Sequence, residues 1–414
     1  MPAASATAAP HDDCDTAPVP GALPSAPPPD RAVRLALDRI AGLPDLPMRA
    51  APLAVCHDRV LAERVRAEAD MPPRDSAAVD GYAFAGAACR GPGPWRLRLT
   101  GRLAVARNLA LDNAFPAREA VRIAAGASIP VPLDRVVAEG DARREGDYIV
   151  LDALPDAVAA IQPRGSAALC GEVIADSHRL LDARDIAGLA GIRRASVKVR
   201  RTLRVAVLAV GANRQDVPAS AALLLAALDR RWIARTDLGT VASGALAGTL
   251  RSAATNADAI LAIDRAGLDN AIETAGGRFV LEGIAMRPGG GVRLALLGET
   301  VVIVVPPAPV DAMTAMAILG WPMLRRRAGI ARSRAVPRAG IAAFSLPADP
   351  ACADYPLVRI AGTGSVPTLE TVTESDGGMM TRLALADGIA LPAPGEAVGF
   401  GARIAWVPIT DRFT

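Results

Sequence analysis

The chain has 414 residues, of which 51% are hydrophobic and only 3% aromatic, and its formal net charge is +3. This length exceeds what one hydrophobic core organises, so we expect about three domains, and so small a charge argues against a nucleic-acid-binding surface. The most apolar window, 301–320, contains prolines and an aspartate that disfavour a membrane span, and the N-terminus lacks the pattern of a secretory signal. We therefore expect a cytoplasmic protein with no nucleic-acid partner and no membrane segment.

The cysteines and histidines indicate neither a metal site nor a disulfide framework. Five cysteines are scattered without a short-spaced pair, and the three histidines, His11, His57 and His178, lie far apart. Zinc sites and disulfide-rich domains depend on closely spaced Cys or His residues. Lys198 is the only lysine in the chain, so no other lysine is a candidate catalyst.

The first helical pattern begins at Asp30. Residues 1–29 are mostly Ala, Pro, Ser and Asp, which bury too little apolar surface to offset the entropy of ordering, so we expect a disordered tail. After Asp30, the predicted N-cap, four apolar residues define one helix face: Val33, Leu35, Leu37 and Ile40.

The stretch 71–86 is the strongest candidate for a ligand loop. Pro72 and Pro73 prevent a helix, because proline has no amide donor and restricts the residue before it. Two acids five residues apart, Asp75 and Asp80, follow in a run of small side chains. A loop of this kind presents carboxylates to a ligand, but an aspartate before a glycine is also typical of an ordinary turn.

The next two regions predict a β-rich module and a spacer. Residues 94–151 contain short extended runs separated by Gly and Pro, at 95–99, 119–124, 134–139 and 148–151. Residues 160–194 carry several glycines and one short helical pattern at 185–192. We interpret this second region as a connection to the following unit.

Residues 200–329 alternate between strand and helix patterns. The predicted strands are 204–210, 232–238, 257–263 and 301–305, and the predicted helices are 218–228, 243–254 and 311–319. This alternation predicts a doubly wound, mainly parallel sheet. Ligands of such sheets bind beyond the carboxyl ends of the strands, so we expect a site among 211–216, 264–270, 287–291 and 306–311.

The remainder predicts a small β-barrel-like domain, with strands at 357–360, 380–385 and 402–407. The full set of predicted domains is a tail (1–29), an α/β domain (30–47 with 200–332), an elongated linker domain (48–65 with 156–199), a β-rich module (66–155) and a C-terminal barrel (333–414).

Five motifs in this order resemble the molybdenum insertase family, which includes bacterial molybdopterin molybdenumtransferase and the E domain of gephyrin. Residues 71–83 resemble Leu-Pro-x-x-Asp-Asn-Ser-Ala-Met-Asp-Gly-Tyr-Ala, and 123–130 resemble Ile-Met-Thr-Gly-Ala-Pro-x-Pro. Residues 205–211 match the strand that leads to Thr-Gly-Asp-Glu. Residues 283–289 resemble Val-Ala-Met-Lys-Pro-Gly, and 306–312 stand in the place of Pro-Gly-Asn-Pro-Val-Ser-Ala.

The resemblance implies an elongated homodimer that takes adenylylated molybdopterin, releases AMP with Mg²⁺ and inserts molybdate into the dithiolene. A molybdoenzyme is then an expected partner. Carried onto this sequence, the resemblance implies Asp75 and Asp80 as catalytic residues. It also implies four substrate-binding positions, Ser128, Arg287, Gly289 and Pro306, and two acids for the metal, Asp264 and Asp269. Arg287 retains a charge that can grip an oxyanion, although 287–291 is equally consistent with a plain turn.

The sequence departs from the family at the positions where the chemistry is expected. The departures are Ala125 for a threonine, Ala212-Asn213 for Asp-Glu, a shortened loop at 264–269, Gly290 for a lysine, and Pro307-Ala308 for Gly-Asn. Mg²⁺ is held by oxygen ligands that include carboxylates, so the changes at 212 and 213 remove most of the charge that would hold it.

Two hypotheses remain for the function. The chain is either a divergent insertase with a rearranged site, or a non-catalytic protein that binds molybdopterin or the finished cofactor as a carrier, chaperone or partner subunit. Metal-dependent hydrolysis without the carboxylates is difficult, which favours the second hypothesis for the mechanism.

Overall fold

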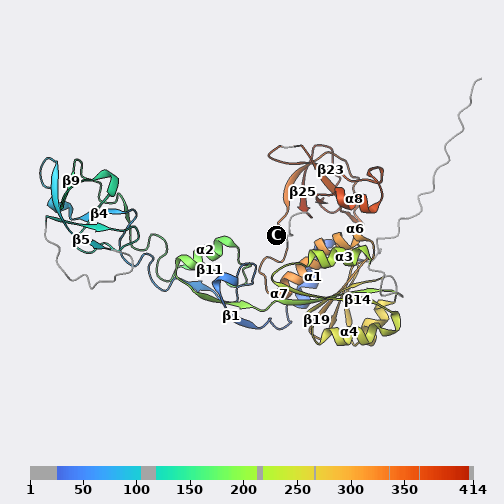
Figure 1. Cartoon of the computed structure of the whole chain (residues 1–414). Helices are drawn as coiled ribbons and strands as arrows, with labels where there is room; N and C mark the ends of the chain where they lie inside the picture. The colour runs from blue at the N-terminus through green and yellow to red at the C-terminus, as the bar shows by residue number, and fades with distance from the viewer. Residues whose placement is uncertain are drawn as a thin grey trace, which may run out of the picture. The chain divides into compact units, whose positions relative to one another are not determined.

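The computed structural model describes residues 26–103, 118–211, 218–264, 267–334, 336–362 and 364–409 (Figure 1). Internal contacts divide the chain into two units. Unit 1 comprises Met1–Pro47 with Arg200–Thr414, and unit 2 is the segment Met48–Val199 between them. The chain therefore leaves unit 1 after its first helix and returns to it about 150 residues later.

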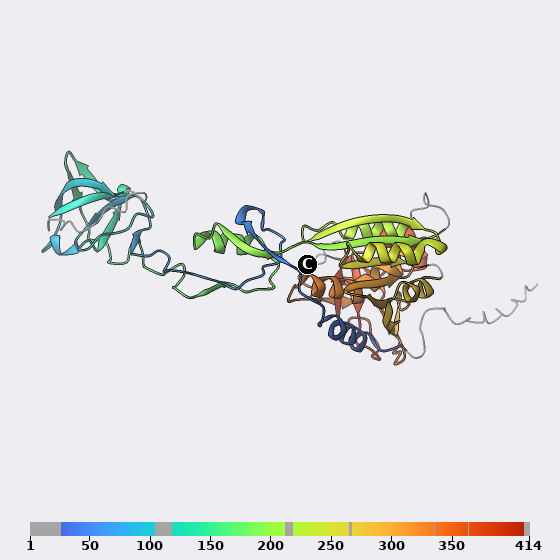
Figure 2. The same cartoon turned by 90° about the horizontal axis from the view of Figure 1, so that it is seen from below.

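Unit 2 contains a curled six-stranded sheet with the strand order β7-β4-β6-β5-β9-β8 (Figure 2). Its strands are β4 (Gly81–Phe84), β5 (Trp95–Leu103), β6 (Glu119–Ile123), β7 (Arg135–Ala138), β8 (Arg143–Glu145) and β9 (Tyr148–Leu151). β5 and β6 run parallel, whereas the other neighbours are antiparallel. β4 is buried on both faces: Tyr82 and Phe84 pack in one apolar cluster, and Ala83 packs in another.

The rest of unit 2 is built on two-stranded sheets and one helix. The sheets pair β1 (Met48–Pro52) with β12 (Ser196–Arg200), β2 (Val65–Arg66) with β11 (Val173–Ala175), and β3 (Ser76–Ala77) with β10 (Ile161–Gln162). The helix α2 (Ala183–Gly191) begins with a capping box, in which the Asp182 carboxylate accepts from the Asp185 backbone N–H and the Asp185 carboxylate accepts from that of Asp182. Leu189 of α2 is fully buried in the apolar cluster of this region.

Unit 1 is organised around a six-stranded sheet with the strand order β14-β13-β15-β19-β18-β16. Its strands are β13 (Leu203–Val210), β14 (Ile233–Val241), β15 (Ala259–Ile263), β16 (Arg278–Glu282), β18 (Arg293–Leu297) and β19 (Thr300–Val305). The first four in the order are parallel, and β18 and β16 extend the sheet antiparallel. All five residues of β15 and all six of β19 are buried, as expected for strands covered on both faces.

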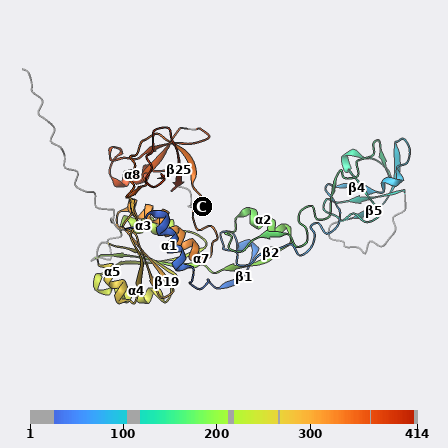
Figure 3. The ribbon, with the colours of Figure 1, turned by 180° about the vertical axis from the view of Figure 1, so that it is seen from behind.

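Helices cover both faces of this sheet. One face carries α1 (Pro29–Ile40), α3 (Ala219–Ala227), α6 (Pro309–Ala315) and α7 (Trp321–Ala328), and the other carries α4 (Leu246–Ala254) and α5 (Leu268–Thr274) (Figures 1 and 3). A π-helical turn, Met316–Gly320, joins α6 to α7. The sheet is therefore doubly wound, and the predicted fold class is confirmed.

The C-terminal part of unit 1 is a closed five-stranded barrel. Its strands are β20 (Arg338–Ala342), β22 (Leu357–Ala361), β23 (Thr368–Thr371), β24 (Gly388–Leu391) and β25 (Arg403–Pro408). Outside the barrel, β17 (Met286–Arg287) pairs in parallel with β21 (Ala353–Asp354) and so links the Arg287 turn to this part of the chain. Trp406 is 2% exposed and anchors the apolar cluster inside the barrel.

Two local predictions are wrong. Residues 380–385 form a helix, α8 (Met379–Leu385), rather than a strand. Met, Leu, Ala and Arg are strong helix formers, and a short apolar run does not reveal its period. The N-cap of α1 is Pro28 rather than Asp30, since Pro29 takes the first helical position and the helix starts two residues earlier.

Other expectations from the sequence remain predictions. The predicted tail falls largely outside the described residues, as do Ala212 and Asn213. The finer domain boundaries remain predictions beside the two units defined by contacts. Among the described helices, none combines the length and apolar character that crossing a bilayer requires.

Candidate functional site

A cavity of about 860 Å³ in unit 1 brings together two of the four site regions predicted from the sequence. It is lined by the 287–291 turn, by the 306–308 loop after β19, and by side chains of the C-terminal part, including Met379 and Arg382 of α8. β15 and β19 end side by side at Ile263 and Val305, so the cavity lies at the carboxyl end of the parallel strands. Its size is within the range typical of small-molecule sites.

The turn after β17 is fixed by hydrogen bonds within the fold. Gly289 has φ +87°, and its backbone N–H donates to the Asp311 carboxylate at 2.8 Å. A Cβ at this position would lie 2.7 Å from the Asp311 carbonyl oxygen, so only glycine fits. Gly289, for which substrate binding stays a prediction, thus lines the cavity, while its amide is bound to Asp311.

Arg287 lines the same cavity and is held by two acids. Its Nη2 lies 3.1 Å from the Asp349 carboxylate and 3.7 Å from that of Asp354. The Asp349 carboxylate in turn accepts from the backbone N–H groups of Ala351 and Cys352. The Arg287 side chain remains 42% exposed, so it is positioned but still accessible to an anion.

The predicted metal ligands are bound to an arginine. Arg293, the first residue of β18, donates from Nη2 to Asp264 and from Nη1 to both carboxylate oxygens of Asp269. The Arg293 side chain is only 20% exposed and also lines the cavity. Asp264 Oδ1 and Arg293 Nε are buried and have no hydrogen-bond partner among the described residues.

These side chains do not fit a magnesium ion. Mg²⁺ requires free oxygen ligands in near-octahedral geometry, whereas the carboxylates of Asp264 and Asp269 are both neutralised by Arg293. Within the described ranges, no three His, Cys, Asp or Glu side chains are grouped so that they could hold a metal.

Arg382 is a third guanidinium in the cavity wall. It projects from α8, and its Nη1 lies 3.9 Å from the Glu374 carboxylate. Its Nε is buried and without a hydrogen-bond partner in the part of the chain that the structure describes. Sequence reasoning missed both Arg293 and Arg382, because neither lies in a motif. The only available signal for Arg293 is a charged residue where a glycine-rich turn enters a buried strand.

The predicted catalytic residues lie in unit 2, where two of the motifs run side by side. The Asp75 carboxylate accepts from the Arg164 N–H at 2.8 Å, and the Asp75 carbonyl accepts from the Ile129 N–H. Ser76 and the half-buried Ser128 form an antiparallel bridge. Asp75, Asp80 and Ser128 therefore belong to one pair of adjacent segments.

Asp80 connects its own segment to neighbouring backbone through two hydrogen bonds. Its carboxylate accepts from the Ala125 N–H at 2.8 Å, and its carbonyl accepts from the Glu139 N–H. Both Asp75 and Asp80 thus hold backbone turns through one carboxylate oxygen, while the residues themselves stay exposed. This arrangement leaves room for a further role at the surface of the loop.

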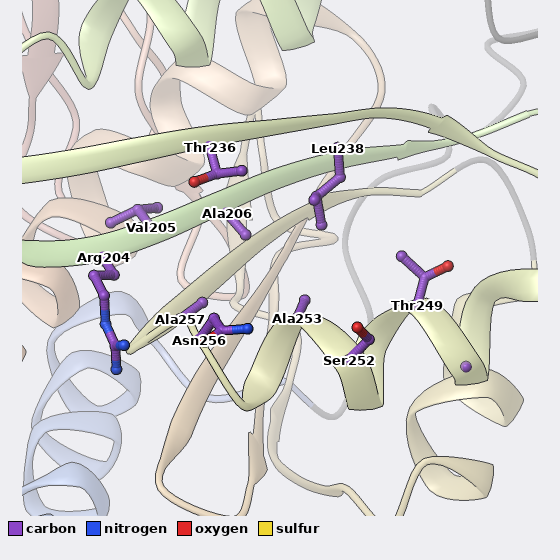
Figure 4. A pocket seen from close by; sticks show the side chains of 11 residues that line it. Arg204, Val205, Ala206, Thr236, Leu238, Thr249, Ser252, Ala253, Asn256 and Ala257 are labelled. Carbon is purple, nitrogen blue, oxygen red and sulfur yellow. The ribbon is translucent and has the colours of Figure 1, made fainter.

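A second cavity, of about 440 Å³, lies between α4 and the edge of the sheet (Figure 4). Thr249, Ser252 and Asn256 face Thr236 and Leu238 across it. The Thr249 hydroxyl donates to the Ala245 carbonyl. Most of this lining is small and neutral, and it includes none of the residues predicted from the sequence. The larger cavity, with its three guanidinium groups, is the candidate functional site.

Comparisons with known proteins identify what the N-terminal half of the chain and the overall fold resemble. Residues 28–192 match the family described as the MoeA N-terminal region (domain I and II). The fold matches the molybdopterin biosynthesis MoeA protein of Pyrococcus horikoshii in two solved structures. The first has a TM-score of 0.75 at 19% identity and covers 92% of this chain and 99% of that one. The second has a TM-score of 0.74 at 20% identity and covers 92% and 100%.

A molybdenum cofactor biosynthesis protein from Pyrococcus furiosus matches with a TM-score of 0.57 at 15% identity, over 92% of this chain and 98% of that one. No curated protein matches the chain. The N-terminal half of the chain therefore matches the MoeA family model, and the chain as a whole shares the fold of these solved proteins.

Proposed function

We propose that this MoeA-family chain acts in molybdenum cofactor biosynthesis by binding molybdopterin or its adenylylated form in the 860 Å³ cavity. The observation that carries the proposal is the placement of Arg287, Arg293 and Arg382 around one cavity at the carboxyl end of the sheet. Guanidinium groups bind phosphate and other oxyanions through paired hydrogen bonds, and the ring system of a pterin suits the apolar part of the wall.

The apolar wall supplies the rest of the binding surface. Met379 and Leu357 come from the C-terminal part, and Val310 comes from α6. A flat heterocycle placed between these side chains buries area that contributes to affinity at about 25 cal/mol per Å². The ligand expected from this chemistry has a flat apolar body and an anionic end.

The arrangement favours a carrier or partner subunit over a metal-dependent hydrolase. The two acids that the resemblance implies as metal ligands, Asp264 and Asp269, are bound to Arg293, so their carboxylates are not free to hold Mg²⁺. The rearranged insertase remains the alternative, since the paired Asp75 and Ser128 segments match the family motifs. A homodimer, a molybdoenzyme partner and a cytoplasmic location also belong to this proposal.

Titration calorimetry of the purified chain with molybdopterin, and separately with AMP, tests the proposal. We expect molybdopterin binding that Arg287→Gln weakens by about tenfold or more, because a charge-assisted hydrogen bond contributes about 1.5–3 kcal/mol. Asp75→Asn should leave this binding unchanged in a carrier. The absence of any pterin binding would contradict the proposal, and Mg²⁺-dependent AMP binding lost in Asp75→Asn would favour the insertase.

A further inference from the structure

Arg293 occupies the position in which a cation would neutralise the two acids at the carboxyl end of the sheet. It is the first residue of β18 and lies opposite Val304 of β19. Asp264 directly follows β15, and its N–H donates to the Val305 carbonyl. Arg293 and Asp264 therefore lie at the ends of strands whose register is fixed by backbone hydrogen bonds, while Asp269 lies in the first turn of α5.

The contacts of Arg293 resemble those of a bound ion more than those of a surface pair. One nitrogen bonds Asp264 and the other bonds both oxygens of Asp269. The Arg293 side chain is 20% exposed and that of Asp264 is 13% exposed, so solvent screens the interaction only partly. Exposed ion pairs of long side chains are rarely fixed in this way.

The guanidinium still has donors for a ligand. Arginine carries five N–H groups and no acceptor. The two acids engage only its terminal nitrogens, and Nε has no hydrogen-bond partner among the described residues. Because Arg293 lines the cavity while its Nε is buried, an anionic group inside the cavity would accept from the terminal N–H groups that the two acids leave free.

We propose that Arg293 is the resident cation of this site, so that the cavity binds an anionic ligand without a divalent metal. The guanidinium supplies positive charge beside Asp264 and Asp269 and keeps both acids from coordinating Mg²⁺. This inference rests on the proposed function only for the identity of the ligand. Arg293 is then the residue that makes ligand binding in this cavity independent of a divalent metal.

Titration calorimetry with MgCl₂ alone tests this role in the full chain. The unmodified protein should give no binding heat, whereas Arg293→Gln should gain a Mg²⁺ site with an affinity on the order of 1 mM, because two carboxylates become available. Arg278→Gln is the matched control, since Arg278 is exposed in the same sheet and does not line the cavity. Circular dichroism verifies that each variant is folded.

Two results would overturn the inference. One is Mg²⁺ binding by the unmodified protein that disappears in Asp264→Asn. The other is a folded Arg293→Gln protein that gains no Mg²⁺ site. If Arg293→Gln fails to fold, Arg293→Lys retains a charge at the same place and should, like the unmodified protein, bind no Mg²⁺.

A second measurement uses AMP as the anionic probe. Its affinity for the unmodified protein should be the same with EDTA and with Mg²⁺, and Arg293→Gln should lower it about tenfold or more. AMP binding that requires Mg²⁺ would overturn the inference. The MgCl₂ titrations involve no pterin, so they decide the inference even if molybdopterin does not bind and the proposed function fails.

Discussion

The strand β15 has an aspartate at each end, and the two carboxylates differ in how completely they are hydrogen-bonded. Asp258, before the strand, is 4% exposed and accepts from both terminal nitrogens of Arg201 at 2.6 and 2.7 Å. It also accepts from the backbone N–H and the side chain of Arg204. Asp264, after the strand, binds Arg293 through one oxygen, and its other oxygen is buried without a partner among the described residues.

The difference separates an ion pair whose oxygens are all hydrogen-bonded from one that leaves an oxygen without a partner. A buried polar network in which each oxygen is hydrogen-bonded fixes the fold, whereas a partly satisfied one is costly and usually has another purpose. Asp258 joins the amino ends of three segments, since its N–H donates to Arg204 and its carbonyl accepts from Val301. Asp264 instead binds Arg293, which lines the cavity in which the ligand is proposed to bind.

The largest effect on stability should follow from Asp258→Ala. Removing this carboxylate leaves Arg201 without its bidentate partner and the Arg204 N–H without an acceptor, which should cost about 3 kcal/mol of unfolding free energy. Urea denaturation monitored by tryptophan fluorescence measures the loss, with Asp264→Ala as the matched change at the other end of the strand. An equal loss in both variants would remove the distinction between the two acids.

The second-largest expected effect is a pH dependence of stability that comes from Asp258. Burial acts to raise the pKa of Asp258, but the hydrogen bonds from Arg201 and Arg204 outweigh it and lower the pKa to about 2. Because the pKa of Asp258 is lower in the folded protein than the unfolded value of 3.8, the charged carboxylate stabilises the fold at pH values above 3.8. This stabilisation is lost as the pH falls toward 2. The contribution is about 2 kcal/mol.

The measurement compares the unmodified protein with Asp258→Asn between pH 6 and pH 2. The stability gap between them should narrow below pH 4 as the native carboxylate is protonated. A gap that stays constant over this range would show that the charge of Asp258 does not contribute.

Asp264→Asn should have a smaller effect on stability. Arg293 keeps its bonds to Asp269, and an amide oxygen can still accept from Nη2, so the expected loss is about 1 kcal/mol or less. The same urea experiment detects it. A loss as large as that of Asp258→Ala would mean that the pair at the cavity also holds the fold together.

Arg382→Gln should leave stability almost unchanged and affect only binding. The side chain has one acid at 3.9 Å, and such surface changes alter stability by less than about 0.5 kcal/mol. If Arg382 meets the anionic end of the ligand, AMP affinity should fall about fivefold or more. Calorimetry with Arg278→Gln as control decides whether α8 takes part in the site.

The sequence predicts the parallel strands of unit 1 well, because strands that are buried on both faces consist mostly of apolar residues. The run 204–210 is apolar after its first residue and rich in valine, which is typical of a strand covered on both faces. The antiparallel additions β18 and β16 escape prediction, because strand order depends on pairing between distant segments rather than on local periodicity. α8 escapes prediction because its apolar run is too short to show a period.

The candidate site is predictable only in part, for the same reason. The motifs lead to Arg287, Gly289 and Pro306, which all line the cavity. Arg293 and Arg382 reach it from a strand and a helix that lie outside every motif. Their contribution depends on how the sheet and the C-terminal part fold around the cavity, and no pattern of neighbouring residues carries that information.

The insertion of unit 2 between α1 and β13 has a consequence for how the protein is made on the ribosome. Domains fold as units during synthesis, at about 5–20 residues per second. The segment Met48–Val199 is complete before the sheet of unit 1 has been translated, so unit 2 can fold first. Helix α1 packs against β16 and α7, so it must wait roughly 10 to 60 s for these partners to be translated, with its apolar face uncovered during that interval.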